Sequence, residues 1–261
     1  MSLDNALWLV SFVAETAVVG LILYRRVWRA FPAFCSYCVW LLLVEIAAFP
    51  VLRFFTIAYL TFYLACAVAY SALEIAVLIE LAWSVLRPFR AALPRGALVL
   101  VAALVFALAA AVWPFAIIPG FNNWPQEWHL LMRLQQTTAI LRIMFFVLLA
   151  GFSQLLSIGW RDRELQVATG LGFYSFVSLT IAILHTHLTA WPQYSHLNQI
   201  ELCGYIFSLL YWVWCFAQKE AERREFTPQM QNLLLAMAGT AKATRIALAD
   251  SAAAKMRKPG E

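Results

Sequence analysis

The segment HLLMRLQQTTAILRIMFFVLLAGFSQLL, residues 129–156, decides the fold because it is long enough to cross a bilayer and carries Arg142 near its middle. An arginine side chain stays protonated in proteins, so its charge cannot be removed at that depth. Neighbouring helices must then supply acceptors for the guanidinium. The segment therefore predicts a bundle of membrane-spanning helices with a polar interior.

The composition points the same way. Hydrophobic residues make up 63% of the 261 residues, charged residues 13%, and the mean hydropathy is +0.75. Such a chain has too few polar side chains to cover a soluble domain of this length. The formal charge of +5 does not indicate nucleic-acid binding, because the basic residues lie mostly beside the ends of apolar runs. We expect an integral membrane protein in contact with the lipid bilayer.

Seven apolar runs are each long enough to span a hydrocarbon core of roughly 30 Å. They cover residues 7–24, 33–51, 58–86, 97–117, 129–156, 166–186 and 199–218. The first run precedes its arginines, which is the reverse of a secretory signal, so we expect it to remain as a helix. These runs predict an all-α, polytopic bundle of seven transmembrane helices over residues 1–218.

The basic residues predict the orientation of the bundle. With the N-terminus outside, two of them, Arg53 and Arg133, lie at outer ends, and eleven lie at inner ends: Arg25, Arg26, Arg29, Arg87, Arg90, Arg95, Arg161, Arg163, Lys219, Arg223 and Arg224. Basic residues accumulate on the cytoplasmic side. We therefore predict the N-terminus outside and the C-terminus inside.

Residues 219–261 are predicted to form a cytoplasmic tail. Thr227 and Pro228 are typical of a helix start. After them, Met230, Leu233, Leu234 and Met237 recur at helical spacing, which predicts a short amphipathic helix over about residues 228–249. The end of the chain, from residue 252, is predicted to be disordered. The tail is the expected contact for a partner protein, and homo-oligomerisation stays open.

Four ionisable side chains near mid-depth form a predicted polar core: Glu15, Glu45, Glu74 and Arg142. Two polar stripes accompany them, one of Tyr63, Tyr70 and Glu74, and one of Gln135, Thr138 and Arg142. On one interpretation, Arg142 pairs with Glu74, with Glu45 and Glu15 as competing partners, and only fixes the packing of the third and fifth helices. On the other, the surplus carboxylates hold a proton or a cation. No catalytic residues are predicted.

Histidines define a second candidate site, an outer pocket. Its residues are His129, His185, His187, His196 and Glu201. Imidazoles and a carboxylate could bind zinc, copper or haem, or respond to external pH. The alternative is four interfacial histidines with no common site, because no i, i+4 histidine pair of the kind used in zinc motifs is present.

Two stretches carry a resemblance to known sequences, namely Phe152-Ser-Gln-Leu-Leu-Ser-Ile-Gly-Trp-Arg161 and Gly170-Leu-Gly172-Phe-Tyr. They resemble a segment of uncharacterised bacterial integral membrane proteins with seven helices. The resemblance covers about the fifth and sixth predicted helices. It implies a seven-helix membrane protein but no activity, and we expect the bacterial inner membrane as its location.

Three functions are compatible with these patterns. The first is a sensor or receptor-like module acting through a partner protein, because residues 219–261 are too few for a kinase or cyclase domain. The second is a secondary transporter or proton-coupled permease that uses the Glu/Arg cluster. The third is a membrane subunit that binds haem or metal through the outer histidines. An enzyme is not expected.

Overall fold

The computed structural model describes residues 3–54, 59–86, 96–116, 126–151, 162–187 and 191–218. These residues form seven α-helices, which confirms the all-α prediction. They are α1 (Leu3–Tyr24), α2 (Pro32–Phe54), α3 (Tyr59–Val85), α4 (Ala97–Val112), α5 (Gln126–Gly151), α6 (Arg163–His187) and α7 (Trp191–Ala217). Short 3-10 turns, η1 (Val27–Arg29) and η3 (Trp113–Phe115), follow α1 and α4. The predicted tail, residues 219–261, lies outside the described residues, as do residues 152–161.

The helix ends differ from the predicted runs in ways that follow from proline. α7 begins at Trp191, earlier than predicted, with Pro192 in its first turn, where a missing N–H costs nothing. α4 ends at Val112, earlier than predicted, and Pro114 lies in the turn that follows. Proline cannot donate to the α-helical ladder, so the helix stops there.

Six of the helices, α1 and α3 to α7, are long and apolar enough to cross a membrane. The outward surfaces of the bundle are apolar too. Large hydrophobic side chains such as Val99, Val147 and Trp214 are exposed on them. A soluble protein would not expose so much apolar surface, whereas lipid tails solvate it. The chain is a multi-pass membrane protein. α2 carries a shorter apolar stretch, Pro32–Ala48.

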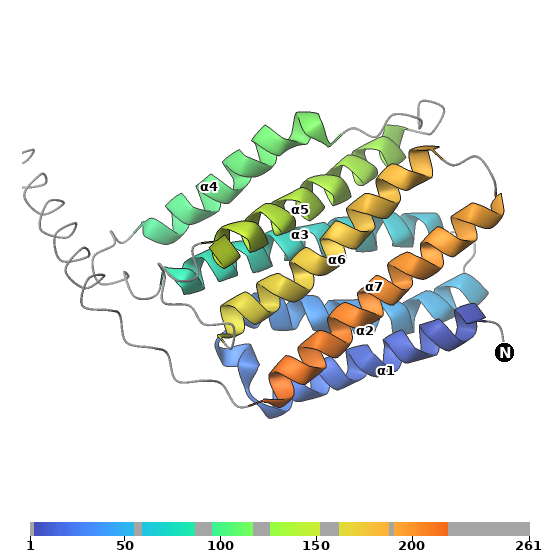
Figure 1. Cartoon of the computed structure of the whole chain (residues 1–261), viewed down its shortest axis with the longest axis horizontal. Helices are drawn as coiled ribbons and strands as arrows, with labels where there is room; N and C mark the ends of the chain where they lie inside the picture. The colour runs from blue at the N-terminus through green and yellow to red at the C-terminus, as the bar shows by residue number, and fades with distance from the viewer. Residues whose placement is uncertain are drawn as a thin grey trace, which may run out of the picture.

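By their contacts six helices form a closed ring. α4 lies at the edge of the bundle, beside α5 (Figure 1). In the ring α1 contacts α2, α2 contacts α3, α3 contacts α5, α5 contacts α6, α6 contacts α7, and α7 returns to α1. Among the helices of the described residues, α4 packs on α3 and α5. We call the end of the bundle at which α1, α3, α5 and α7 begin the N-terminal end, and the opposite end the C-terminal end. The ring encloses an interior that differs between the two ends.

Towards the C-terminal end the interior is tightly packed. Trp212 is 2% exposed, and its ring meets the edge of Phe34 at a centroid distance of 5.1 Å. Phe216, one turn further along α7, lies 5.9 Å from the Phe34 ring. Gly170 on α6 allows Trp212 to approach the backbone, because a Cβ at that position would be 2.2 Å from the indole Nε1. This half of the bundle is a dense aromatic and aliphatic core.

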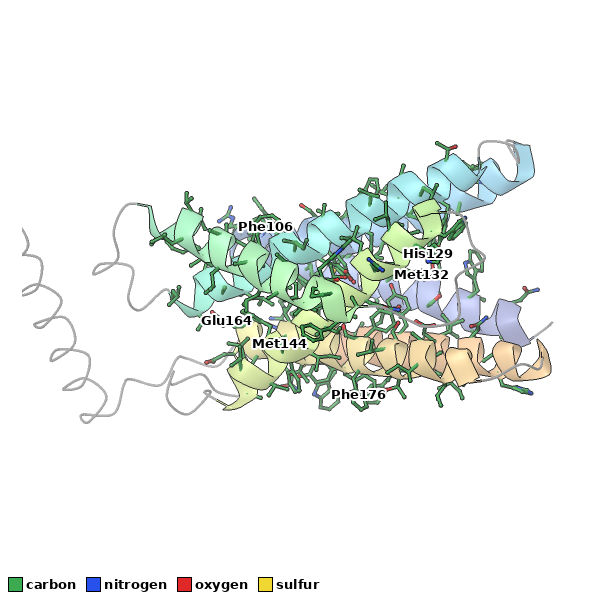
Figure 2. The ribbon with its side chains drawn as sticks, turned by 90° about the horizontal axis from the view of Figure 1, so that it is seen from above. Phe106, His129, Met132, Met144, Glu164 and Phe176 are labelled. Carbon is green, nitrogen blue, oxygen red and sulfur yellow. The ribbon has the colours of Figure 1, made fainter. Side chains whose placement is uncertain are left out.

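Two arginines hold the C-terminal end of α7. Arg163 donates to the carbonyl oxygens of Cys215 and Gln218 at 2.9 and 3.1 Å, and Arg25 donates to that of Ala217 at 2.7 Å. The last carbonyls of a helix have no partner within it, so side chains from α1 and α6 supply their hydrogen bonds. Glu164, near this end in Figure 2, accepts a bond from Ser84 of α3. α7 is thereby fixed to α6 and to the end of α1, and α6 is fixed to α3.

The start of α2 is held in a similar way by Glu80 of α3. The Glu80 carboxylate accepts hydrogen bonds from the backbone N–H groups of Ala33 and Phe34, both at 2.9 Å. These N–H groups belong to the first turn of α2, where no carbonyl of the same helix can accept them. Glu80 thus does for α2 what an N-cap side chain does, but from another helix.

Replacing Glu80 by Gln should lower the free energy of unfolding by about 1–2 kcal/mol, because an amide offers one acceptor where two N–H groups need one each. Denaturant unfolding in detergent would measure the loss. Ser36→Ala is a suitable control near the start of α2. Ser36 is exposed, and its hydroxyl donates a hydrogen bond to the Pro32 carbonyl of the same helix. An equal loss in both variants would show that Glu80 does not act as a cap.

Candidate functional site

A cavity of about 520 Å³ lies inside the ring, in the half nearer the N-terminal end. Each of the six ring helices contributes to its wall, and the contacts described place no residue of α4 in it. The polar lining residues are Glu15, Glu45, Tyr63, Tyr70, Glu74, Gln135, Gln136, Arg142, Tyr174, Ser178, Glu201 and Tyr205. The volume is typical of a small-molecule site. The cavity is therefore the candidate functional site.

An ion pair lies at mid-depth, where the cavity meets the packed core. Arg142 of α5 donates to Glu74 of α3, and the two residues are only 5% and 2% exposed. The Arg142 guanidinium also lies over the ring of Tyr174, at 5.7 Å from its centroid. A cation placed over an aromatic face is attracted by the ring's negative charge density. Arg142 is thus engaged by α3 and α6 at the same time.

Hydrogen bonds across the cavity join the remaining helices. The Tyr205 hydroxyl of α7 donates to Glu15 of α1 at 2.5 Å, and Ser178 of α6 donates to Glu201 of α7, also at 2.5 Å. The Tyr37 and Tyr70 hydroxyls lie 3.0 Å apart and link α2 to α3. Bonds from hydroxyls to carboxylates are stronger than neutral ones. The cavity wall is therefore a network that spans the ring.

Several charged groups in this network lack a full set of partners. One carboxylate oxygen, Oε2, of each of Glu15, Glu45 and Glu74 is buried without a hydrogen-bond donor, and so is the Nε of Arg142 without an acceptor. Glu15 and Glu45 both line this cavity, from the neighbouring helices α1 and α2. Buried polar atoms are normally paired, so unpaired ones need a reason. The site has more acceptors than its own side chains satisfy.

Sequence reasoning placed Glu15, Glu45, Glu74 and Arg142 in one polar core, and the structure brings all four to this cavity. Tyr63, Tyr70 and Gln135 from the predicted stripes also line it. Thr138 does not, because its hydroxyl bonds to the Gln135 carbonyl and its side chain faces an apolar groove beside α4.

The predicted outer pocket is arranged differently. Glu201 lines the central cavity, while His129 and His196 do not. His129 is half-buried near the start of α5, close to Met132 in Figure 2, and His196 is exposed. The side chains of His185 and His187 lie outside the described residues. Among the side chains that are described, no three His, Cys, Asp or Glu residues are grouped so that they could hold a metal ion.

Several residues of the site were not predicted from the sequence. Tyr174 and Ser178 lie on α6, and Tyr205 lies on α7 four residues after Glu201. Both pairs have the i, i+4 spacing that places side chains on one face of a helix. A polar stripe on each of these two helices, counted with its uncharged residues as on α3, would have indicated these positions.

No family model matches the chain, and neither a curated protein nor a solved structure matches it.

Proposed function

We propose that this protein is an integral membrane sensor or receptor-like module that binds a small molecule in the ring cavity and passes the signal to a partner protein. The observation that carries the proposal is the asymmetry of the ring interior. One half holds a polar cavity of about 520 Å³, and the other half is closed by packed side chains around Phe34, Trp212 and Phe216. A cavity that is closed at one end by packed side chains suits the binding of a molecule better than its passage through the ring.

The proposed orientation puts the cavity on the outer side of a bacterial inner membrane. Arg25, Arg26, Arg29 and Arg163 all lie at the C-terminal end, which the positive-inside rule assigns to the cytoplasm. α2 would be the seventh span. Its 23 residues extend roughly 35 Å at 1.5 Å per residue, which is enough to cross the hydrocarbon core.

α7 provides a physical route from the cavity to the inner surface. Glu201 and Tyr205 line the cavity, and Ala217 at the other end of the same helix is held by Arg25. Between them, Ser208 donates to the Gly170 carbonyl at 3.1 Å, so α7 stays packed on α6. A ligand that moves Tyr205 would therefore displace a helix whose far end adjoins the tail. The tail, residues 219–261, is the proposed contact for the partner.

Ligand binding can be tested by filling the cavity. Ala139 is buried and lines it, so Ala139→Leu should weaken binding of any ligand found there at least tenfold. The full-length chain in lipid nanodiscs would be screened against a library of small metabolites by melting temperature, and the affinities of the ligands found would be measured calorimetrically. Ala107→Leu, exposed on α4, is the matched control. Unchanged affinity in Ala139→Leu would refute this cavity as the binding site.

A secondary transporter is the second candidate, and the arrangement of the ring is the observation that favours it. α1 to α3 and α5 to α7 are two runs of three consecutive helices in the ring, and α4 connects them along the chain from outside the ring. Many transporters place their site between two such units. Flux of a cavity ligand into proteoliposomes separates the candidates. Binding without flux favours the receptor, and flux that is lost in Glu74→Gln favours the transporter.

A further inference from the structure

We propose that the ligand of this cavity is a small organic cation, whose charge lies between Glu15 and Glu45 and whose apolar part contacts tyrosine rings. The inference rests on the proposed ligand-binding function and adds the chemical class of the ligand. Three properties of the cavity lead to it: its charge, its unpaired oxygen atoms and its aromatic lining.

The charge of the cavity wall is unbalanced. Four carboxylates line the cavity, from Glu15, Glu45, Glu74 and Glu201, whereas Arg142 is the single cationic side chain among the described lining residues. Arg142 is already paired with Glu74. Buried charges without an opposite charge are strongly unfavourable. A cationic ligand would supply the missing positive charge.

The unpaired oxygens show where that charge would lie. Glu15 is 3% exposed, and while it accepts a bond from Tyr205 through Oε1, its Oε2 has no donor. Oε2 of Glu45 on the neighbouring helix has none either. Both side chains line the cavity from the neighbouring helices α1 and α2, and two ionised carboxylates there would repel each other. A positive group between them would offset that repulsion, and an ammonium N–H would donate a hydrogen bond to one of the unpaired oxygens.

The lining and the volume indicate the rest of the ligand. Tyr63, Tyr70, Tyr174 and Tyr205 line the cavity, and the rings of Tyr174 and Tyr205 lie 5.3 Å apart. Aromatic faces bind ammonium groups and the methyl groups attached to them. A cavity of about 520 Å³ is far larger than a single inorganic ion. A substituted ammonium compound matches both the aromatic surface and the space.

The test compares cations with matched uncharged and anionic compounds on the full-length chain in nanodiscs. Choline and phenyltrimethylammonium are the cationic probes, 3,3-dimethylbutan-1-ol is the uncharged isostere of choline, and benzoate is the anion. We expect the cations to raise the melting temperature and the other two compounds to leave it unchanged. We also expect Glu15→Gln and Glu45→Gln each to weaken binding of the cations at least tenfold.

Two measurements keep folding and binding apart. Without ligand, Glu15→Gln and Glu45→Gln should melt close to the temperature of the unmodified chain, since glutamine keeps the shape of the side chain and, at position 15, an oxygen that accepts the Tyr205 bond. Glu80→Gln is the charge-matched control, because Glu80 is bonded to the start of α2 and does not line the cavity. It should leave the affinity for the cations unchanged.

Three results would overturn the inference: no cation binds, the alcohol or benzoate binds as tightly as the cations, or the cations bind equally well to the Glu15→Gln/Glu45→Gln double variant. The proposed function would fail separately. The proposed ligand-binding function stands if another ligand binds and its affinity is lower in Ala139→Leu. That function is refuted if Ala139→Leu leaves the affinity of every ligand unchanged.

Discussion

Glu74→Ala should lower the free energy of unfolding of the bundle by about 3–5 kcal/mol, because it leaves the Arg142 guanidinium buried without its partner. Arg142 is 5% exposed, and the carboxylate it contacts belongs to a side chain with no exposed surface. An uncompensated guanidinium near the bilayer centre costs at least about 2.5–3.5 kcal/mol on insertion scales. Thermal or denaturant unfolding in detergent micelles would measure the loss.

The double variant shows whether the pair itself causes the loss. Glu74→Ala combined with Arg142→Leu removes both charges, so it should recover much of the stability lost in Glu74→Ala. The same cycle with Glu45→Ala in place of Glu74→Ala serves as the control, and its coupling to Arg142→Leu should be smaller. Additive effects of Glu74→Ala and Arg142→Leu would contradict the ion pair seen between α3 and α5.

Gly170→Ala should be the most damaging change of a single methyl group in the packed half of the ring. The added Cβ would lie 2.2 Å from Nε1 and 2.5 Å from Cε2 of Trp212. The indole cannot move away easily, because Trp212 is buried and its ring meets Phe34. We expect a loss of about 3 kcal/mol in the free energy of unfolding, at the upper end of the usual cost of overpacking.

Two further variants test that explanation. Gly170→Ala with Trp212→Phe should be more stable than Gly170→Ala alone, since the smaller ring makes room for the methyl group. Gly20→Ala is the matched control, because a Cβ there meets nothing within 4 Å, and alanine should raise helix stability by up to about 1 kcal/mol. If Gly170→Ala and Gly20→Ala unfolded at the same denaturant concentration, the close approach of α6 and α7 would be wrong.

The parts of the fold that depend on local energetics were predictable. Long apolar runs can only be satisfied as spanning helices, and Arg142 at mid-depth required a carboxylate nearby. The place of α4 outside the ring was missed, although its run is the most apolar of the six candidate spans and has no polar side chain at mid-depth. A helix that is apolar on every face has no polar stripe to direct inwards.

Contacts between distant residues explain what else was missed. Glu80 accepts hydrogen bonds from backbone N–H groups of α2 that lie 46 and 47 residues earlier in the chain. No pattern of side chains in the sequence predicts such a bond. Tyr205 meets Glu15 across 190 residues, at the closure of the ring between α1 and α7. Which helix neighbours which is decided by packing of the whole bundle. The sequence identified the polar faces and the pairing of Arg142 with Glu74, which the structure confirms, but not how the other faces are paired.

The position of α4 has a consequence for the dipoles of the helices. Consecutive helices cross in opposite directions, so their dipoles attract, but α3 beside α5 and α7 beside α1 run in the same direction, and their dipoles repel. These two junctions carry the Glu74–Arg142 pair and the Glu15–Tyr205 bond. The cavity side chains therefore form cross-links at the two junctions of the ring where neighbouring helix dipoles are unfavourably aligned. A ligand that engaged Glu15, as proposed above, would act directly on the bond that joins α1 to α7.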